Sequence, residues 1–334
     1  MPGRKTKDTD YLFLSTRLHA LESYMLTRAK ICEIIDCPQF NDAAKLLEDS
    51  GYRDMSDMDI SQIDAALEMH RTDIFDDIAD FAPCSALLDI FRLKYDNHNA
   101  KVILKAGGDG SRANGLLSES GRVPSTHMQV AFYSSDYSIL SVRLAAAMSE
   151  AKKILEKTAD PQASDIALDK AYFDELLDIS RKLNNRFIDN YVRSLIDGAN
   201  LRATVRTLRS GRDTAFLKSA LIPGGNTEIS FFASLSHPYD GLVSRFTSTA
   251  YELAAKAGLA AISGGGLSAF ELECDNAVMS SLLDAKLMSF GAGTVAAYII
   301  ALEAEITAVR MILTCKRYGM AQEKIRERLR DLYV

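Results

Sequence analysis

Apolar residues recur every three to four positions along most of this 334-residue chain. Between residues 11 and 35 they follow one face of a helix, at Leu14, Leu18, Leu21, Tyr24, Met25 and Ile31. The same spacing occurs at 63–80, 85–105, 138–157, 164–209, 242–261 and 268–288, and the last stretch, 322–334, is amphipathic in the same way. The alternation typical of β-strands is scarce, and 127–135 is its nearest example. The pattern predicts an all-α protein.

The most hydrophobic run of the chain, 290–320, contains three formal charges. Glu303, Glu305 and Arg310 fall inside its most apolar window, Thr294 to Leu313. Each charge near the middle of a membrane span costs about 2.5–3.5 kcal/mol on insertion scales. We therefore expect a helix buried inside protein, whose charges find partners there, and no membrane span.

The charges of this run belong to a pattern that occurs three times. An acidic residue is followed five positions later by a basic residue, and nine positions after that by a glycine. Asparagine stands three positions after the acid in the first two copies, and Ala308 takes that place in the third. The three copies are Asp96, Asn99, Lys101 and Gly110; Asp197, Asn200, Arg202 and Gly211; and Glu305, Arg310 and Gly319.

A weaker element precedes each copy. Its acids, Asp64, Asp169 and Glu273, lie 32, 28 and 32 residues before the acids of the first pattern. Two elements at similar spacings, each found three times, indicate an internal triplication. We expect three similar helical modules, at residues 1–124, 125–213 and 214–334.

Helix geometry predicts what the repeated charges do. Five residues turn a helix about 140° beyond a full circle, so the acid and the base of one copy face different neighbours. The alternative is three independent charges that face solvent. The glycine fits the position after a helix end, with Lys105, Arg209 or Lys316 closing the last turn. If Arg310 is buried and pairs with an acid of a neighbouring helix, Arg310→Leu would lower the free energy of unfolding by several kcal/mol.

Composition and short motifs exclude several functions. The net charge of −6 argues against a nucleic-acid binder that uses its whole surface. The five cysteines form no CxxC pair, and the histidines form no metal pattern. The glycine-rich stretches lack the GK[ST] of a phosphate-binding loop. The polar first ten residues lack the apolar core of a secretory signal, so we expect a cytoplasmic location. We expect no cofactor, no metal site and no catalytic residue.

Two charged groups carry alternative hypotheses. Asp76, Asp77 and Asp80 form a DDxxD sequence, which in all-α isoprenoid synthases binds Mg²⁺ and diphosphate. A second acidic cluster is missing, so a solvated helix face is the competing interpretation. The second group is a basic stripe at Arg202, Arg206 and Arg209, with Arg212 following, which can dock an acidic partner or simply face solvent.

The C-terminal sequence GAGTVAAYIIALEAEITAVRMILTCKRYGMAQEKIRERLRDLYV resembles the end of the C subunit of V/A-type rotary ATPases, the homologue of the d subunit of eukaryotic V-ATPases. The stretches LDKAYFDELL and YLFLSTRLHALESYMLTRAKICEII are similar to the central signature and the opening helix of that family. The likeness covers most of the chain and is weakest between 105 and 160. The family often has Pro near 291–294 and Asn where this chain has Ala308.

The resemblance implies a funnel of three similar helical modules about a pseudo-threefold axis. It implies a non-catalytic central-stalk subunit, a socket that couples the rotary shaft to the membrane ring of proteolipid subunits for ATP-linked transport of H⁺ or Na⁺. The implied partners are the ring and the shaft subunits, with the stator membrane subunit as a further candidate, and no nucleic acid. The implied location is the cytoplasmic face of the membrane, as a peripheral protein.

Overall fold

The computed structural model describes residues 6–107, 110–113, 115–239, 241–280 and 282–333. Within these ranges every regular element is an α-helix or a 3₁₀-helix, and none is a strand. The all-α fold class is therefore confirmed. The stretch with the nearest approach to a strand pattern lies almost wholly in helix α6 (Ser125–Ser134).

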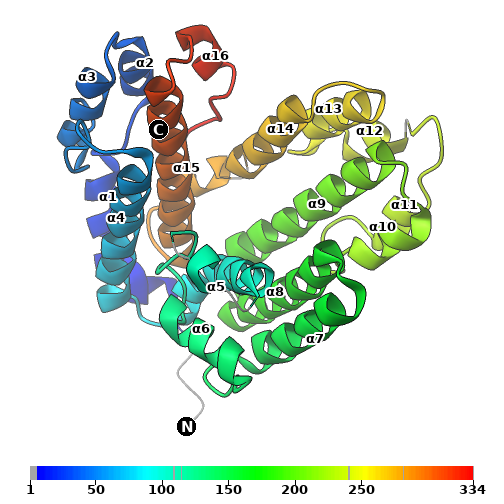
Figure 1. Ribbon diagram of the computed structural model, residues 1–334. Coiled ribbons are helices and arrows are strands. Elements are labelled where there is room, and N and C mark those ends of the chain that lie inside the picture. The colour runs from blue at the N-terminus through cyan, green and yellow to red at the C-terminus, as the bar shows by residue number, and fades with distance from the viewer. Residues whose placement is uncertain (1–5, 108–109, 114, 240, 281, 334) are drawn as a thin grey trace.

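The first helices of the chain pack around one of the last (Figure 1). Helix α15 (Ala292–Arg317) contacts α1 (Leu12–Glu22), α3 (Phe40–Lys45) and α4 (Ile60–Phe81). The same group contains α2 (Arg28–Asp36), α16 (Gln322–Arg326) and the 3₁₀ turns η1 (Asp8–Tyr11) and η2 (Glu48–Ser50). We call this group the split unit, because its helices come from both ends of the chain.

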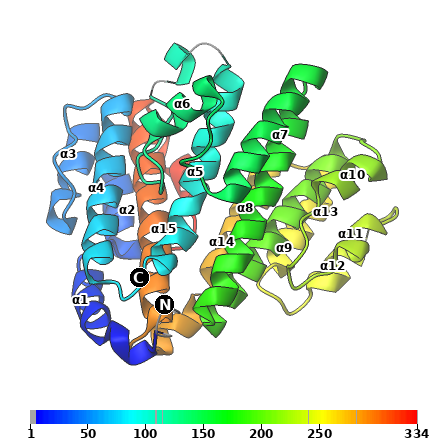
Figure 2. The ribbon, with the colours of Figure 1, turned by 90° about the horizontal axis from the view of Figure 1, so that it is seen from below.

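Two further groups lie beside the split unit (Figure 2). The α5 unit consists of α5 (Ala86–Ala106), η3 (Gly110–Ala113), α6, α7 (Val142–Thr158) and α8 (Pro161–Leu183). The α9 unit consists of α9 (Arg186–Arg209), α10 (Thr214–Ala220), α11 (Ile229–Ala233), α12 (Gly241–Phe246), α13 (Glu252–Ile262) and α14 (Leu267–Ser280). The turn η4 (Leu283–Leu287) leads from α14 to α15.

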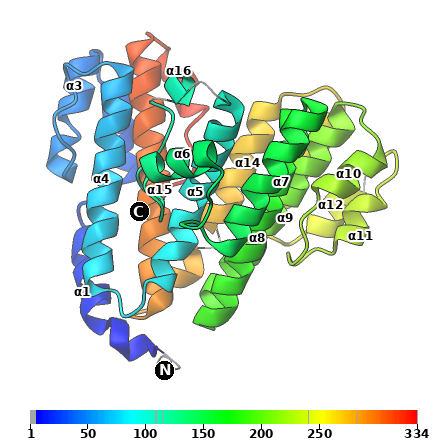
Figure 3. The ribbon, with the colours of Figure 1, turned by 60° about the horizontal axis from the view of Figure 1, so that its bottom comes forward.

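The three units share one packing scheme. In each, the helix that carries the repeated acid and base packs against a helix that carries the partner acids: α5 on α8, α9 on α14, and α15 on α4. The turns that join α4 to α5, α8 to α9 and α14 to α15 lie at the lower end of the molecule in Figure 3. The division of the chain after residues 124 and 213 stays a prediction.

Polar side chains fix where several helices begin. Asp59 accepts a hydrogen bond from the backbone N–H of Gln62, whose side chain bonds back to Asp59, so α4 starts with a capping box. Ser141 and Asn185 cap the first turns of α7 and α9 in the simpler way. The long helices therefore start at residues whose side chains satisfy otherwise unpaired backbone donors.

Buried apolar residues form three clusters. The largest joins α1–α4 and α15 to the neighbouring ends of α5, α8 and α9. A second cluster fills the space between the later half of α9 and α10–α14, and a third fills the space between the later half of α5 and α6–α8. The α5 and α9 units thus have their own cores at one end and share the core of the split unit at the other.

The charged hydrophobic run forms the helix at the centre of this shared core. Residues 292–302 of α15 are all buried. Among the helices that the structure describes, none is long and apolar enough to cross a membrane. The run is apolar because protein surrounds it on nearly every side.

The predicted helix ends are correct at two of the three repeated glycines. Gly211 and Gly319 follow the ends of α9 and α15 with φ of +66° and +67°, the left-handed conformation that glycine adopts without strain. Gly110 instead lies in η3, and Gly107, with φ of +61°, ends α5. The repeat at Gly110 is therefore a match of spacing and not of structure.

The basic side chains lie in the last turns of these helices, as expected, but they bind neighbouring segments. Lys105 pairs with Asp165 of α8. The guanidinium of Arg209 donates to the carbonyl of Ala261, and the ammonium of Lys316 donates to that of Cys37. Each side chain binds a neighbouring segment instead of its own helix.

Candidate functional site

The repeated acids are buried and each holds a distant stretch of backbone. Asp96 of α5 accepts hydrogen bonds from the N–H groups of Arg122 and Val123, at 2.9 and 3.2 Å. Asp197 of α9 accepts from Asn226 and Thr227, at 3.1 and 2.9 Å. Because each carboxylate satisfies two backbone donors, it fixes the course of the segment beyond its helix.

The repeated asparagines complete the same arrangement. The side chain of Asn99 exchanges two hydrogen bonds with the backbone of Ser118, at 2.7 and 2.8 Å. Asn200 does the same with Ile222, at 2.8 Å for both bonds. An Asp and an Asn one turn apart thus bind two points, four residues apart, on an irregular, bent segment.

This arrangement requires glycine at two positions beside the carboxylates, and no motif in the sequence marks either position. A Cβ at Gly121 would lie 2.5 Å from Oδ1 of Asp96, and one at Gly225 would meet Oδ1 of Asp197 equally closely. Neither glycine has the positive φ that glycine usually serves. These glycines let the backbone come close to the carboxylate, a role that cannot be recognised from their positions in the sequence.

The third acid binds the opposite end of the chain. Glu305 accepts hydrogen bonds from the N–H of Leu26 at 2.5 Å and the hydroxyl of Tyr52 at 2.8 Å. Burial raises the pKa of Glu305, and these two donors only partly oppose the rise. Ala308 cannot supply the amide that the asparagines of the other two copies provide. The third copy therefore holds the start of the chain in the split unit.

The repeated bases pair with acids on the partner helix of their own unit. Lys101 lies 2.5 Å from Asp169, and Arg310 lies 2.7 Å from Asp64, so two acids of the weaker repeated element are the partners. Arg202 instead pairs with Glu271 at 2.9 Å and Asp275 at 2.6 Å. These two acids are one turn apart on α14 and flank Glu273, the acid of the weaker repeated element. As the helical offset predicts, acid and base of each copy face different neighbours.

Arg310 is not the buried strut that the sequence suggests. Its side chain is 60% exposed, and that of Asp64 is 32% exposed. A more shielded charge lies two turns earlier at Glu303, whose side chain is 14% exposed. It accepts a hydrogen bond from the hydroxyl of Tyr95 and lies 3.0 Å from Lys94 and 3.4 Å from Arg71. Burial alone would raise the pKa of Glu303, but the two cations hold it below its ordinary value.

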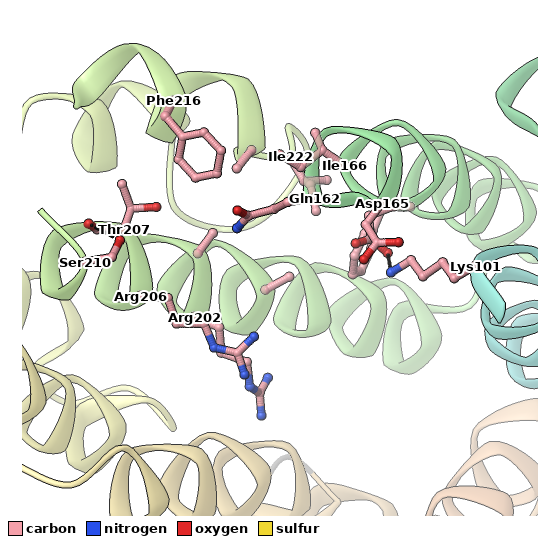
Figure 4. A pocket seen from close by; sticks show the side chains of 15 residues that line it. Lys101, Gln162, Asp165, Ile166, Arg202, Arg206, Thr207, Ser210, Phe216 and Ile222 are labelled. Atoms are coloured by element: carbon pink, nitrogen blue, oxygen red, sulfur yellow. Dashed lines mark hydrogen bonds and ion pairs between the residues drawn. The ribbon is translucent and has the colours of Figure 1, made fainter. Parts of the chain in front are cut away.

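A pocket of about 420 Å³ lies between α8, α9 and α10, with Lys101 of α5 at its edge. In Figure 4, Phe216 and Ile222 line one side, and Arg202 and Arg206 project from α9 toward α14. The charges at its edges are mostly paired, as in Lys101 with Asp169 and Lys105 with Asp165. The pocket is a mixed apolar and charged surface, suited to binding a protein segment.

Arg206, Arg209 and Arg212 all have partners within the chain. Arg206 pairs with Glu271 at 2.7 Å and lines the pocket. Arg209 donates to the carbonyls of Ala261 and Gly265. The guanidinium of Arg212 lies 4.3 Å from the ring centre of Phe216. Their role as partner contacts stays a prediction.

The aspartates of the DDxxD sequence do not face a common ligand. Asp77 forms two hydrogen bonds with Arg17, at 2.9 and 2.7 Å, and Asp76 pairs with Arg92 at 2.8 Å. In the part of the chain that the structure describes, no group of three or more Cys, His, Asp and Glu side chains is placed to hold a metal ion. The isoprenoid synthase hypothesis finds no support here.

Comparisons with known proteins agree with the resemblance at the C-terminus. The family model of the ATP synthase (C/AC39) subunit matches residues 14–328. The C subunit of the A-type ATP synthase of Pyrococcus horikoshii is 22% identical, over 98% of this chain and 92% of that protein. The C subunit of the V-type sodium ATPase of Enterococcus hirae is 21% identical, over 97% of this chain and 99% of that protein. The C subunit of the A-type ATP synthase of Methanocaldococcus jannaschii is 23% identical, over 96% of this chain and 86% of that protein.

These matches confirm the predicted family and, with it, the prediction of a non-catalytic subunit. The match spans all three units, because it begins inside α1 and ends just beyond α16. The chain belongs to the ATP synthase (C/AC39) subunit family.

Proposed function

We propose that this protein is the central-stalk subunit of a V/A-type ATPase or ATP synthase, a socket that couples the rotary shaft to the membrane ring of proteolipid subunits. The family match over residues 14–328 carries this proposal. The relatives are named as C subunits of A-type ATP synthases and of a V-type sodium ATPase, which supports an ATP-linked transport complex. The transported ion is then H⁺ or Na⁺.

The internal construction suits a part that transmits torque. Buried acids fix the segments beyond α5 and α9, and α15 holds both chain ends together through Glu305. Such contacts between distant segments resist relative movement of the units. In this proposal the three units are related by a pseudo-threefold axis, and together they form the funnel.

We further propose that the pocket beside Arg206 contributes to the shaft contact. It lies between two units, and its lining combines apolar surface from Phe216 and Ile222 with α9, from which Arg206 projects toward Glu271 of α14. Rings and arginines of this kind are common at the centres of protein interfaces. The protein itself would lie on the cytoplasmic face of the membrane as a peripheral subunit, with the stator membrane subunit as a further partner.

The test is a pull-down with a tagged copy of the chain from native membranes solubilised in mild detergent. Recovery of a proteolipid ring together with ATPase head and shaft subunits is the expected result. Arg206→Glu should reduce recovery of the shaft and head while the ring is retained. Arg181→Glu, at a surface position outside the pocket, is the matched control. A tagged chain that recovers neither ring nor shaft would refute the proposal.

A further inference from the structure

Two irregular, bent segments lie between neighbouring units in the same way. Segment 118–123 of the α5 unit is bound by Asp96 and Asn99, and segment 222–227 of the α9 unit is bound by Asp197 and Asn200. We call these the seam segments. Each follows the acid of its own unit by about the same distance along the chain, 22–27 residues in one case and 25–30 in the other.

Each seam segment also contacts the partner helix of the preceding unit. Glu68 of α4 accepts hydrogen bonds from the N–H groups of Glu119 and Ser120, at 2.9 and 3.1 Å, and from the hydroxyls of Ser118 and Ser120. Gly224 lies so close to Leu177 of α8 that a Cβ there would be 2.6 Å from a Leu177 methyl carbon. A seam segment therefore joins two units.

The C-terminal tail, residues 328–333, occupies the corresponding place in the split unit. It follows Glu305 by 23–28 residues, and it contacts α14, the partner helix of the preceding α9 unit. The N–H of Asp331 donates to Oδ1 of Asn276 at 2.9 Å, and Nε of Arg330 lies 2.5 Å from Oδ2 of Asp275. In Figure 1 the dark red tail runs along the side of α15 that faces α14.

The tail differs from the other two seam segments in how it is held. Glu305, the acid of its unit, binds Leu26 and Tyr52 instead, and Ala308 replaces the repeated Asn. Its ion pair is partly exposed, with Arg330 at 33% and Asp275 at 38%. Apolar contacts with the largest core cluster anchor its other side, through Leu329, Leu332 and Tyr333.

We propose that the C-terminal tail is the third seam segment and acts as a releasable latch that holds α14 against the split unit. It shares Asp275 with Arg202, whose Nη2 lies 2.6 Å from the other carboxylate oxygen, so the latch is joined to the repeated ion pair of α9. Release of the tail removes its contacts with Asp275 and Asn276 and loosens this seam, although Met279 of α14 stays in the shared core. The seams closed by 118–123 and 222–227 stay shut.

Amide hydrogen exchange on the full chain tests the latch. Truncation after Glu327, and separately Arg330→Ala, should raise exchange in α14 (267–280) by about tenfold while exchange in α8 (161–183) stays unchanged. Arg328→Ala is the matched control, because Arg328 lies in the same tail with an exposed side chain, and it should change neither helix. Arg330→Lys keeps the charge and should restore part of the protection.

The salt dependence of hydrogen exchange distinguishes a local effect of the tail on α14 from a general loss of stability. Raising NaCl from about 0.05 to about 0.5 M screens partly exposed ion pairs, so it should speed exchange of α14 in the unsubstituted chain. The effect should be smaller in Arg330→Ala, where only the pairs of α14 with Arg202 and Arg206 remain. Unchanged exchange of α14 after truncation would overturn the proposal. An equal rise in α8 and α14 would also overturn it, because the tail would then stabilise the whole fold without acting on one seam.

Discussion

Glu303 and Arg310 lie two turns apart on α15, and the structure predicts opposite results for their removal. Glu303→Leu takes away the acceptor for the Tyr95 hydroxyl and one carboxylate partner of Lys94 and Arg71. Breaking a buried pair costs about 3–5 kcal/mol. Because Arg71 keeps its pair with Glu68 of α4, we expect a loss at the low end of this range, about 3 kcal/mol. Arg310→Leu breaks a pair that is 60% exposed on one side, so we expect less than about 1 kcal/mol.

Urea and thermal unfolding monitored by circular dichroism measure the difference. For a chain of this size, about 3 kcal/mol corresponds to a drop in melting temperature of roughly 6–12 °C, against roughly 2–4 °C or less for Arg310→Leu. Glu303→Gln, which keeps an oxygen for Tyr95, should fall between them. Equal losses of unfolding free energy for Glu303→Leu and Arg310→Leu, with unchanged m-values in urea, would refute the conclusion that the ion pairs of Glu303 are shielded and that of Arg310 is exposed.

Three further predictions concern the repeated acids. Gly121→Ala should cost about 1–3 kcal/mol of unfolding free energy, because its Cβ meets Asp96, whereas Gly266→Ala, with open space around it, should be nearly neutral in the same denaturation assay. Tyr52→Phe removes a hydrogen bond to Glu305 and should cost about 1–3 kcal/mol by the same measurement. Because the pKa of Glu305 is raised in the folded state, its contribution to stability is full below the unfolded pKa and is lost as the pH rises through the folded pKa. Glu305→Gln should therefore remove a decline in stability that begins above about pH 4.3, measured as unfolding free energy against pH.

The helices and the repeated charges could be predicted from the sequence because both depend on local spacing. A 3.6-residue period is visible within one helix, and the offset of five residues between Asp197 and Arg202 fixes their relative directions whatever surrounds them. The spacing of the weaker element marked Asp64 and Asp169 as repeated acids, and the structure shows that they pair with Arg310 and Lys101.

The exposure of each charge could not be predicted in the same way. An apolar run shows that α15 is mostly buried, but it does not show which part of the helix reaches solvent, so the prediction that Arg310 is buried is wrong. The third acid of the weaker element, Glu273, is not the partner of Arg202, for a geometric reason. Glu273 lies two residues from Glu271 and so about 200° around α14, facing away from Arg202.

Contacts between residues far apart in the sequence could not be predicted from the spacing of residue types. Glu305 binds Leu26, 279 residues away in the sequence, and no periodicity connects them. The tail contact of Arg330 with Asp275 likewise depends on where separate units meet. Repeats indicated that three units exist, and the fold alone showed that one of them is built from both chain ends.

That division has a consequence for synthesis on the ribosome. Residues 12–81 emerge first, yet the buried face of α4 and the carboxylate that holds Leu26 and Tyr52 wait for α15, more than two hundred residues later. During most of translation this early segment has exposed apolar surface and no completed core. We expect the α5 and α9 units to fold before the segment that precedes them, so that the order of folding departs from the usual N-terminal-first sequence and the last residues made complete the first ones.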